Sequence, residues 1–112
     1  QLDCTGEPAK ISVCHCLECQ RRTGSAFGVA VFFVHSQVKI SGETGVYTRD
    51  SDSGFPVEHH FCRECGTTAF WYPTRKPQLV AVALGCFADP QFPRPDQQVY
   101  EHHRHAWVVA TL

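Results

Sequence analysis

The sequence contains no methionine and no apolar run long enough to span a membrane. A transmembrane helix needs about 20 consecutive apolar residues, so we expect no membrane partner. No basic start followed by an apolar stretch marks a signal peptide. The chain opens at Gln1. Because an intact translation product begins with methionine, we expect a short N-terminal segment to be missing.

An excess of charge of one sign is also absent. The 10 Lys and Arg residues nearly balance the 11 Asp and Glu residues, and the formal net charge is -1. A broad electrostatic surface for nucleic acid requires a strong positive excess, so no nucleic-acid partner is expected. The sequence shows no internal repeat and no linker, and its 112 residues suit a single domain spanning 1–112.

Helix signals are few, and short strand patterns dominate. One or two helical turns are predicted from Leu17 to Arg22, ended by Gly24. Apolar or alternating segments between turn residues are typical of strands. Such segments cover 9–13, 27–34, 37–41, 45–49, 57–61, 68–72 and 79–84, with one or two last strands within 99–109. The sequence therefore predicts a mainly β domain, built as a folded sheet or half-open barrel.

Five of the seven cysteines lie in two tight clusters. Cys14, Cys16 and Cys19 form the first, and Cys62 and Cys65 form the second. A disulfide framework fits poorly, because the number of cysteines is odd and three of them fall within six residues. Closely spaced thiols instead suit a soft divalent metal. A metal-binding protein of the reducing cytoplasm is the interpretation we favour.

The first cluster has the spacing of an open metal site. Cys16 and Cys19 form a Cys-x-x-Cys knuckle. Cys14 ends a predicted strand and points to the same face as Cys16, because side chains alternate with a period of two. Three protein ligands with one open position are typical of catalytic zinc, whereas four ligands close a structural site. An open position beside soft sulfur ligands suits a thiol substrate.

The second cluster leaves two metal arrangements open. Cys62 and Cys65 form a knuckle followed by Gly66, but two sulfurs do not complete a site. One arrangement is a single closed zinc held by both knuckles, with Cys14 as a spare thiol. The other has two separate metals. Spacing alone does not decide between them.

Residues 14–27, Cys-His-Cys-Leu-Glu-Cys-Gln-Arg-Arg-Thr-Gly-Ser-Ala-Phe, resemble a motif of a known enzyme family. That family comprises the glutathione-dependent formaldehyde-activating (GFA) enzymes, also called centromere-protein-V-like proteins, which have the Mss4-like β fold. The segment Phe-Cys-Arg-Glu-Cys-Gly at 61–66 resembles the second family motif. Residues 85–90 resemble a family turn, with Ala88 in place of one Asp, and Trp107 matches an aromatic residue near the C-terminal end.

The resemblance implies two zinc sites. The open site would be held by Cys14, Cys16 and Cys19. The structural site would be shared between Cys62, Cys65 and an N-terminal Cys-x-Cys that falls upstream of Gln1, so this chain would carry it incomplete. The remaining thiols, Cys4 and Cys86, are interpreted as small buried hydrophobic residues.

The resemblance also implies a reaction, the condensation of glutathione with formaldehyde to S-(hydroxymethyl)glutathione. The chain would then be a carbon–sulfur lyase or synthase whose partners are a small thiol and a small carbonyl compound. The alternative is a zinc-stabilised binding module of Mss4-like fold without catalysis, because a fold does not determine a function.

Residues after the first knuckle are candidates for binding the substrate. Arg21 and Arg22 could hold substrate carboxylates, although at least one of them is expected to be a solvated surface cation. Thr23, Gly24 and Ser25 could line the mouth of the open site, where glycine lets the backbone approach a ligand.

Histidines and aromatic residues receive structural interpretations. His15 is expected to point away from Cys14 and Cys16 because of the strand alternation. The other histidines considered are expected on the surface; they are His59, His60, His102, His103 and His105. Five aromatic residues are expected in the core rather than at a substrate platform; they are Phe27, Phe32, Phe33, Phe70 and Trp71.

Overall fold

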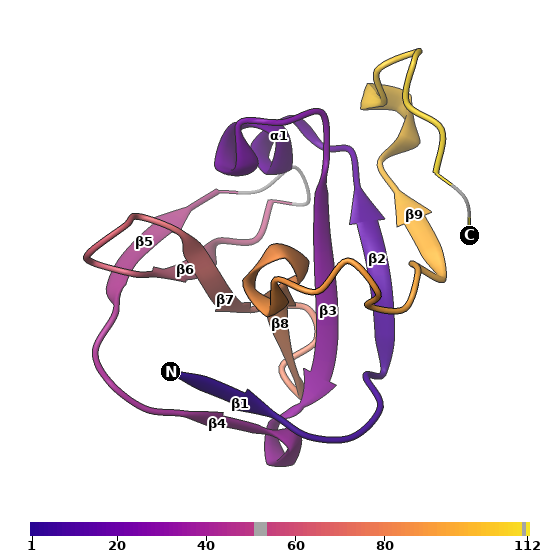
Figure 1. Cartoon of the computed structure of the whole chain (residues 1–112). Coiled ribbons are helices and arrows are strands. Elements are labelled where there is room, and N and C mark those ends of the chain that lie inside the picture. The colour runs from indigo at the N-terminus through magenta and orange to yellow at the C-terminus, as the bar shows by residue number, and fades with distance from the viewer. Residues whose placement is uncertain (51–53, 111) are drawn as a thin grey trace.

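The computed structural model describes residues 1–50, 54–110 and 112, and it is mainly β (Figure 1). The principal sheet has seven strands. Their spatial order is β5 (Gly45–Arg49), β6 (Val57–Phe61), β7 (Thr68–Tyr72), β8 (Leu79–Ala83), β3 (Gly28–Val34), β2 (Lys10–Cys14) and β9 (Gln97–Val99). Neighbouring strands in this sheet pair antiparallel, except that β2 and β9 pair parallel. A separate ribbon pairs β1 (Leu2–Cys4) with β4 (Val38–Ile40).

Most strand predictions are confirmed, and two differences have a physical cause. The last predicted strand, within 99–109, is wrong: β9 ends at Val99 and the 3-10 helix η3 (Glu101–His103) follows, with no further strand among described residues up to 110. Strand β1 was not predicted, because its three residues make a strand only by pairing with β4. The segment between β5 and β6 includes residues 51–53, which lie outside the described part.

The core lies against the central strands β2, β3, β7 and β8. Six residues form its largest buried cluster: Ile11, Val31, Phe33, Phe70, Val80 and Val82. Strand β8 is buried along its whole length, which explains its continuous apolar sequence. Two further 3-10 helices, η1 (His35–Gln37) and η2 (Leu84–Phe87), connect the strands around this core.

The single α-helix, α1 (Leu17–Thr23), lies at one end of the sheet beside the end of β2 (Figure 1). The Cys16 sulfur caps its first turn by accepting a hydrogen bond from the Cys19 N–H at 3.3 Å. Gly24 ends the helix at φ +63°, a left-handed conformation that glycine adopts without strain. The predicted helical segment is confirmed. No helix in the described residues is both long and apolar enough to cross a bilayer.

Candidate metal centre and cavity

Three sulfurs from consecutive elements meet at the end of β2. Cys14 is the last residue of β2, Cys16 caps α1, and Cys19 lies in the first turn of that helix. Their sulfur atoms all lie within 4.8 Å of one another. The local strand–turn–helix conformation is sufficient for this convergence, since only six residues take part. These three residues form a group that could hold a metal ion.

Hydrogen bonds among the three thiols make their protonation unequal. Hydrogen bonds from Cys14 and Cys19 lower the pKa of Cys16, and the Cys19 backbone N–H and Arg49 act in the same direction. The corresponding bonds with Cys16 and Cys19, together with burial, raise the pKa of Cys14. The three sulfurs lie close enough together to bind one cation as a group. This donor set fits a soft divalent metal such as zinc.

The cysteine turn is anchored by the parallel strand β9. Cys14 pairs with Val99, and the His15 N–H donates to the Val99 carbonyl at 3.1 Å. The His15 ring is fully buried and lies 2.9 Å from the Gln98 side-chain oxygen. His15 is therefore a packed residue that holds the turn in place.

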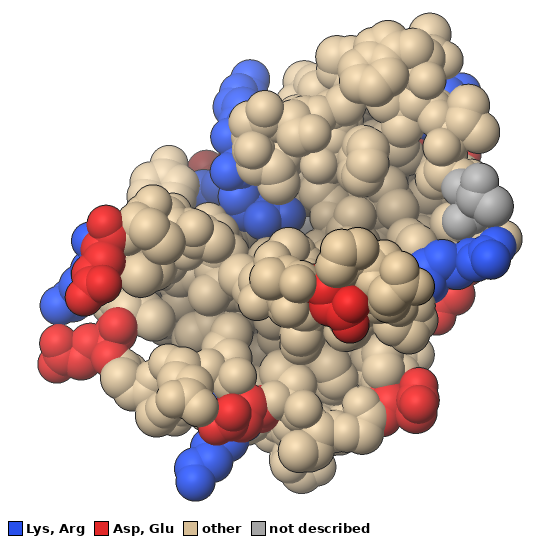
Figure 2. Space-filling model, in the orientation of Figure 1, with Lys and Arg blue, Asp and Glu red and all other residues tan. Residues whose placement is uncertain are grey.

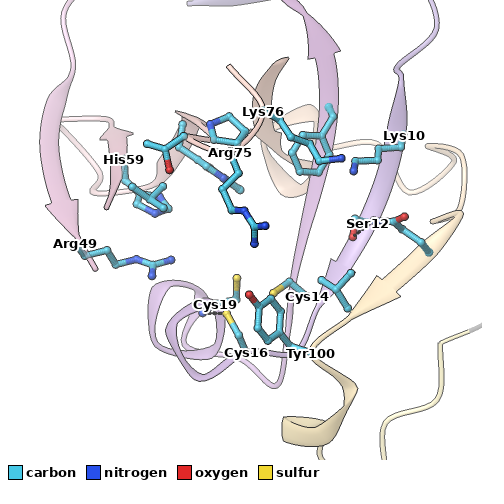
Figure 3. A pocket seen from close by; sticks show the side chains of 17 residues that line it. Lys10, Ser12, Cys14, Cys16, Cys19, Arg49, His59, Arg75, Lys76 and Tyr100 are labelled. Atoms are coloured by element: carbon cyan, nitrogen blue, oxygen red, sulfur yellow. Dashed lines mark hydrogen bonds between the residues drawn. The ribbon is translucent and has the colours of Figure 1, made fainter. Parts of the chain in front are cut away.

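A cavity of about 290 Å³ opens above the three sulfurs (Figure 3). Strands β2, β3, β6, β7 and β9 contribute to its wall, together with the turn between β7 and β8. Its lining consists of Lys10, Ser12, Cys14, Cys16, Cys19, Phe32, Arg49, Val57, His59, Trp71, Pro73, Thr74, Arg75, Lys76, Gln97, Val99 and Tyr100. The candidate metal ligands thus lie at one end of a space that can admit a small molecule.

His59 lies in the wall of this cavity, which corrects the expectation that it is a surface residue. Only 4% of His59 is exposed, and its ring lies 5.2 Å from that of Trp71. Neither ring nitrogen has a hydrogen-bond partner among the described residues. Burial, with the Arg49 and Arg22 cations, lowers the pKa of His59 to about 4. The ring is a neutral imidazole at pH 7, with polar atoms available to a ligand.

The sequence did contain a signal for His59. In β6, Glu58 is exposed whereas Val57 and His59 both line the cavity, as the period of two along a strand requires. The neighbouring His60 contacts Glu58 at 3.1 Å and stacks on Phe70. Adjacent residues of a strand point to opposite faces, so His59 lies in the cavity wall and His60 does not.

The two arginines of α1 have different surroundings. Arg21 is an exposed cation paired with Glu18 at 2.7 Å, as expected for one of the two. Arg22 instead lies over the Trp71 ring at 4.6 Å. A Cβ added at Gly28 would lie 2.5 Å from the Arg22 guanidinium, so this glycine leaves room for the arginine. Substrate binding by either arginine stays a prediction.

Thr23, Gly24 and Ser25 are not among the residues that line the cavity. Gly24 and Ser25 instead border a surface depression with Trp107. Two aromatic residues expected only in the core, Phe32 and Trp71, do line the cavity, although Trp71 is also buried at 9% exposure.

The second knuckle lies apart from the first. The group of closely spaced sulfurs contains only Cys14, Cys16 and Cys19 among the described residues, so the two knuckles do not form one closed four-cysteine site. The Gly66 N–H donates to the Cys62 carbonyl at 2.8 Å, and Gly66 has φ +80°. Cys62 and Cys65 present their thiols from this turn, and their metal binding stays a prediction.

Replacing Gly66 by alanine is expected to destabilise this knuckle. A side chain in the left-handed conformation costs about 1–2 kcal/mol, and Gly66 has that conformation. Urea unfolding of Gly66→Ala measures the loss. Gly85→Ala is the matched control, because nothing lies within 4 Å of its added Cβ and its φ is not positive. If the two variants have equal free energies of unfolding, an alanine side chain at position 66 causes no strain, and the prediction is wrong.

The remaining cysteines differ from each other. Cys4 is half-buried against the core, and burial raises the pKa of its thiol. Cys86 is exposed and donates to the Thr68 carbonyl at 3.6 Å. The interpretation as a buried hydrophobic residue is therefore wrong for Cys86, whose position in the 3-10 helix η2 brings it to the surface.

Comparison with protein-family models gives a match over most of the chain. Residues 1–103 match the family model described as glutathione-dependent formaldehyde-activating enzyme. The matched region includes both knuckles and every residue that lines the cavity. Trp107 lies beyond it and is 74% exposed. A search of curated proteins finds no match to the chain.

Proposed function

Because the chain belongs to the family of glutathione-dependent formaldehyde-activating enzymes, we propose that it adds a thiol such as glutathione to formaldehyde or a similar small carbonyl compound. The observation that carries this proposal is the group of three sulfurs within 4.8 Å at the end of a cavity. With glutathione and formaldehyde, the product is S-(hydroxymethyl)glutathione, and the enzyme is a carbon–sulfur lyase or synthase.

We propose that Cys14, Cys16 and Cys19 hold a zinc ion. Their close spacing and unequal protonation support this assignment. When bound, zinc would hold the substrate sulfur as a thiolate in the position that the three cysteines leave open. Cys62 and Cys65 would contribute to a second, structural zinc site.

A residue of the cavity wall would then stabilise the negative charge that develops on the carbonyl oxygen. The substrate sulfur forms a bond to the carbonyl carbon, the π electrons of the C=O bond move to oxygen, and oxygen takes one proton. Thiol and aldehyde thus give the adduct with no other reactant. His59, neutral and without a partner for either ring nitrogen in the described structure, is placed to donate an N–H to this oxygen. Such a donor stabilises the charge that appears in the transition state.

The setting we propose is the cytoplasm. All seven cysteines are free thiols, and a reducing compartment keeps thiols in that state. It is also where a thiol cosubstrate would remain reduced.

Two measurements on one sample test the proposed function. Cobalt replaces zinc, and its absorption spectrum is followed while glutathione is added; a change shows that the thiol enters the coordination shell. Exchange between free and thiol-bound ¹³C-formaldehyde is then measured by NMR, because the uncatalysed addition is itself reversible. We expect exchange faster than the uncatalysed background, and background exchange in Cys16→Ser. Background exchange in the metal-loaded wild type, with no spectral response to any thiol, would leave only the zinc-stabilised binding module.

A further inference from the structure

The wall of the cavity is strongly cationic. Four of its residues carry a positive charge, namely Lys10, Arg49, Arg75 and Lys76, and no Asp or Glu is among the described residues that line it. In contrast, cationic and anionic side chains are interspersed on the outer face shown in Figure 2. This concentration of one sign inside a cavity, in a chain whose net charge is -1, indicates an anionic ligand.

Lys10 and Lys76 come close together at the end of the cavity away from the cysteines (Figure 3). Lys10 begins β2, and Lys76 lies in the turn between β7 and β8. Burial and the neighbouring Lys76 ammonium lower the pKa of Lys10. The Lys10 nitrogen lies 4.9 Å from the centre of the Phe32 ring, which holds the side chain against the wall. Two like charges held near each other repel, and an anion bound between them offsets this repulsion.

The positive charges of Lys10 and Lys76 are not balanced by an ion pair within the described part of the chain. Among the described residues, no carboxylate forms an ion pair with Lys10 or Lys76. Asp96 is the acidic group that acts on Lys10, but its carboxylate accepts the Ile11 N–H at 2.8 Å. Arg49, by contrast, has Glu18 at 3.5 Å. The two ammonium groups are therefore available to a ligand.

Strand β2 sets the separation between these ammonium groups and the cysteines. Lys10, Ser12 and Cys14 alternate along β2 and all line the cavity. Four residues of strand separate the Lys10 and Cys14 Cα atoms by about 13 Å. Between them lies the Ser12 hydroxyl, which accepts from the Gln97 side-chain amide at 3.1 Å. A ligand with its sulfur at the cysteines and an anion at the lysines must be extended.

We propose that Lys10 and Lys76 form a carboxylate subsite that selects a peptide-sized, anionic thiol. The position of the ligand's sulfur rests on the proposed function, whereas the subsite itself rests on the cavity and its charges. A peptide chain spans at most about 3.3–3.6 Å per residue, so a thiol of three residues covers up to about 11 Å, and the lysine and cysteine side chains that line the cavity cover part of the remaining distance. A terminal carboxylate of glutathione fits this description, and 2-mercaptoethanol is too short.

The test compares three variants of the zinc-loaded protein. Lys10→Gln and Lys76→Gln each remove one charge from the subsite, and Lys39→Gln, an exposed residue of β4 outside the cavity wall, is the matched control. Each subsite variant is expected to raise the KM for glutathione about tenfold, as the loss of a charge-assisted hydrogen bond would. Lys39→Gln should match the wild type with both thiols, and the effect of each subsite variant on KM should be smaller with 2-mercaptoethanol, which is too short to reach the lysines.

Binding without catalysis separates this proposal from the proposed function. S-methylglutathione keeps both carboxylates but has no free thiol, and its affinity is measured by calorimetry. We expect binding to the wild type and to Lys39→Gln, and about tenfold weaker binding to each subsite variant. That result in a protein without catalysed exchange would support the subsite and contradict the proposed function. Equal affinity of all four proteins, or equal KM values for glutathione, would overturn the subsite.

Discussion

Cys16→Ser is expected to remove the metal from the first cysteine group while leaving helix α1 intact. Serine replaces a soft sulfur ligand by a hydroxyl, and two remaining thiols do not hold zinc firmly. The same residue caps α1 through its side chain, and serine is among the best capping residues. The helix therefore keeps its start, and a loss of metal cannot be attributed to its unfolding.

Metal content after purification and the absorption of the cobalt form measure this effect. We expect Cys16→Ser to lose the thiolate-to-cobalt absorption of the open site and all catalysed exchange. Cys86→Ser is the matched control, since Cys86 is exposed and lies outside the group of three sulfurs. A Cys16→Ser protein that kept its full metal content and an unchanged cobalt spectrum would exclude Cys16 as a ligand.

His59→Phe is expected to slow turnover by about 10²–10³-fold, the range for loss of one hydrogen-bond donor that stabilises charge developing on oxygen. Phenylalanine keeps a flat ring against Trp71, which lies 5.2 Å from the His59 ring, but it has no nitrogen to offer the carbonyl oxygen. The variant should retain its metal and its affinity for S-methylglutathione. The effect is then confined to the chemical step.

His60→Phe provides the control for this variant. His60 is the next residue of β6 but contacts Thr44 and Glu58 rather than the cavity. We expect near wild-type turnover from it. Turnover of His59→Phe equal to that of His60→Phe would contradict the role proposed for His59, and a loss of metal from His59→Phe would indicate that the ring supports the metal centre instead.

Short-range patterns in the chain were sufficient to predict most of the strands and the convergence of the first cysteine group. Alternation and turn residues located seven of the nine strands, because each pattern reports the local pairing of polar and apolar faces. Patterning failed for β1 and for β9. Both depend on partners distant in sequence, β4 for the first and β2 for the second.

The spacing of Cys14, Cys16 and Cys19 alone made their convergence predictable, because six residues passing from a strand through a turn into a helix leave little freedom to their side chains. The cavity above them was not predictable in this way. His59, Lys10 and Lys76 come from three separate parts of the chain. They line one cavity because β2, β6, β7 and β8 belong to the same sheet, and Lys76 lies in the turn that connects β7 to β8. The group that could hold a metal ion is made by neighbouring residues, whereas the cavity above it depends on contacts between residues that are distant in sequence.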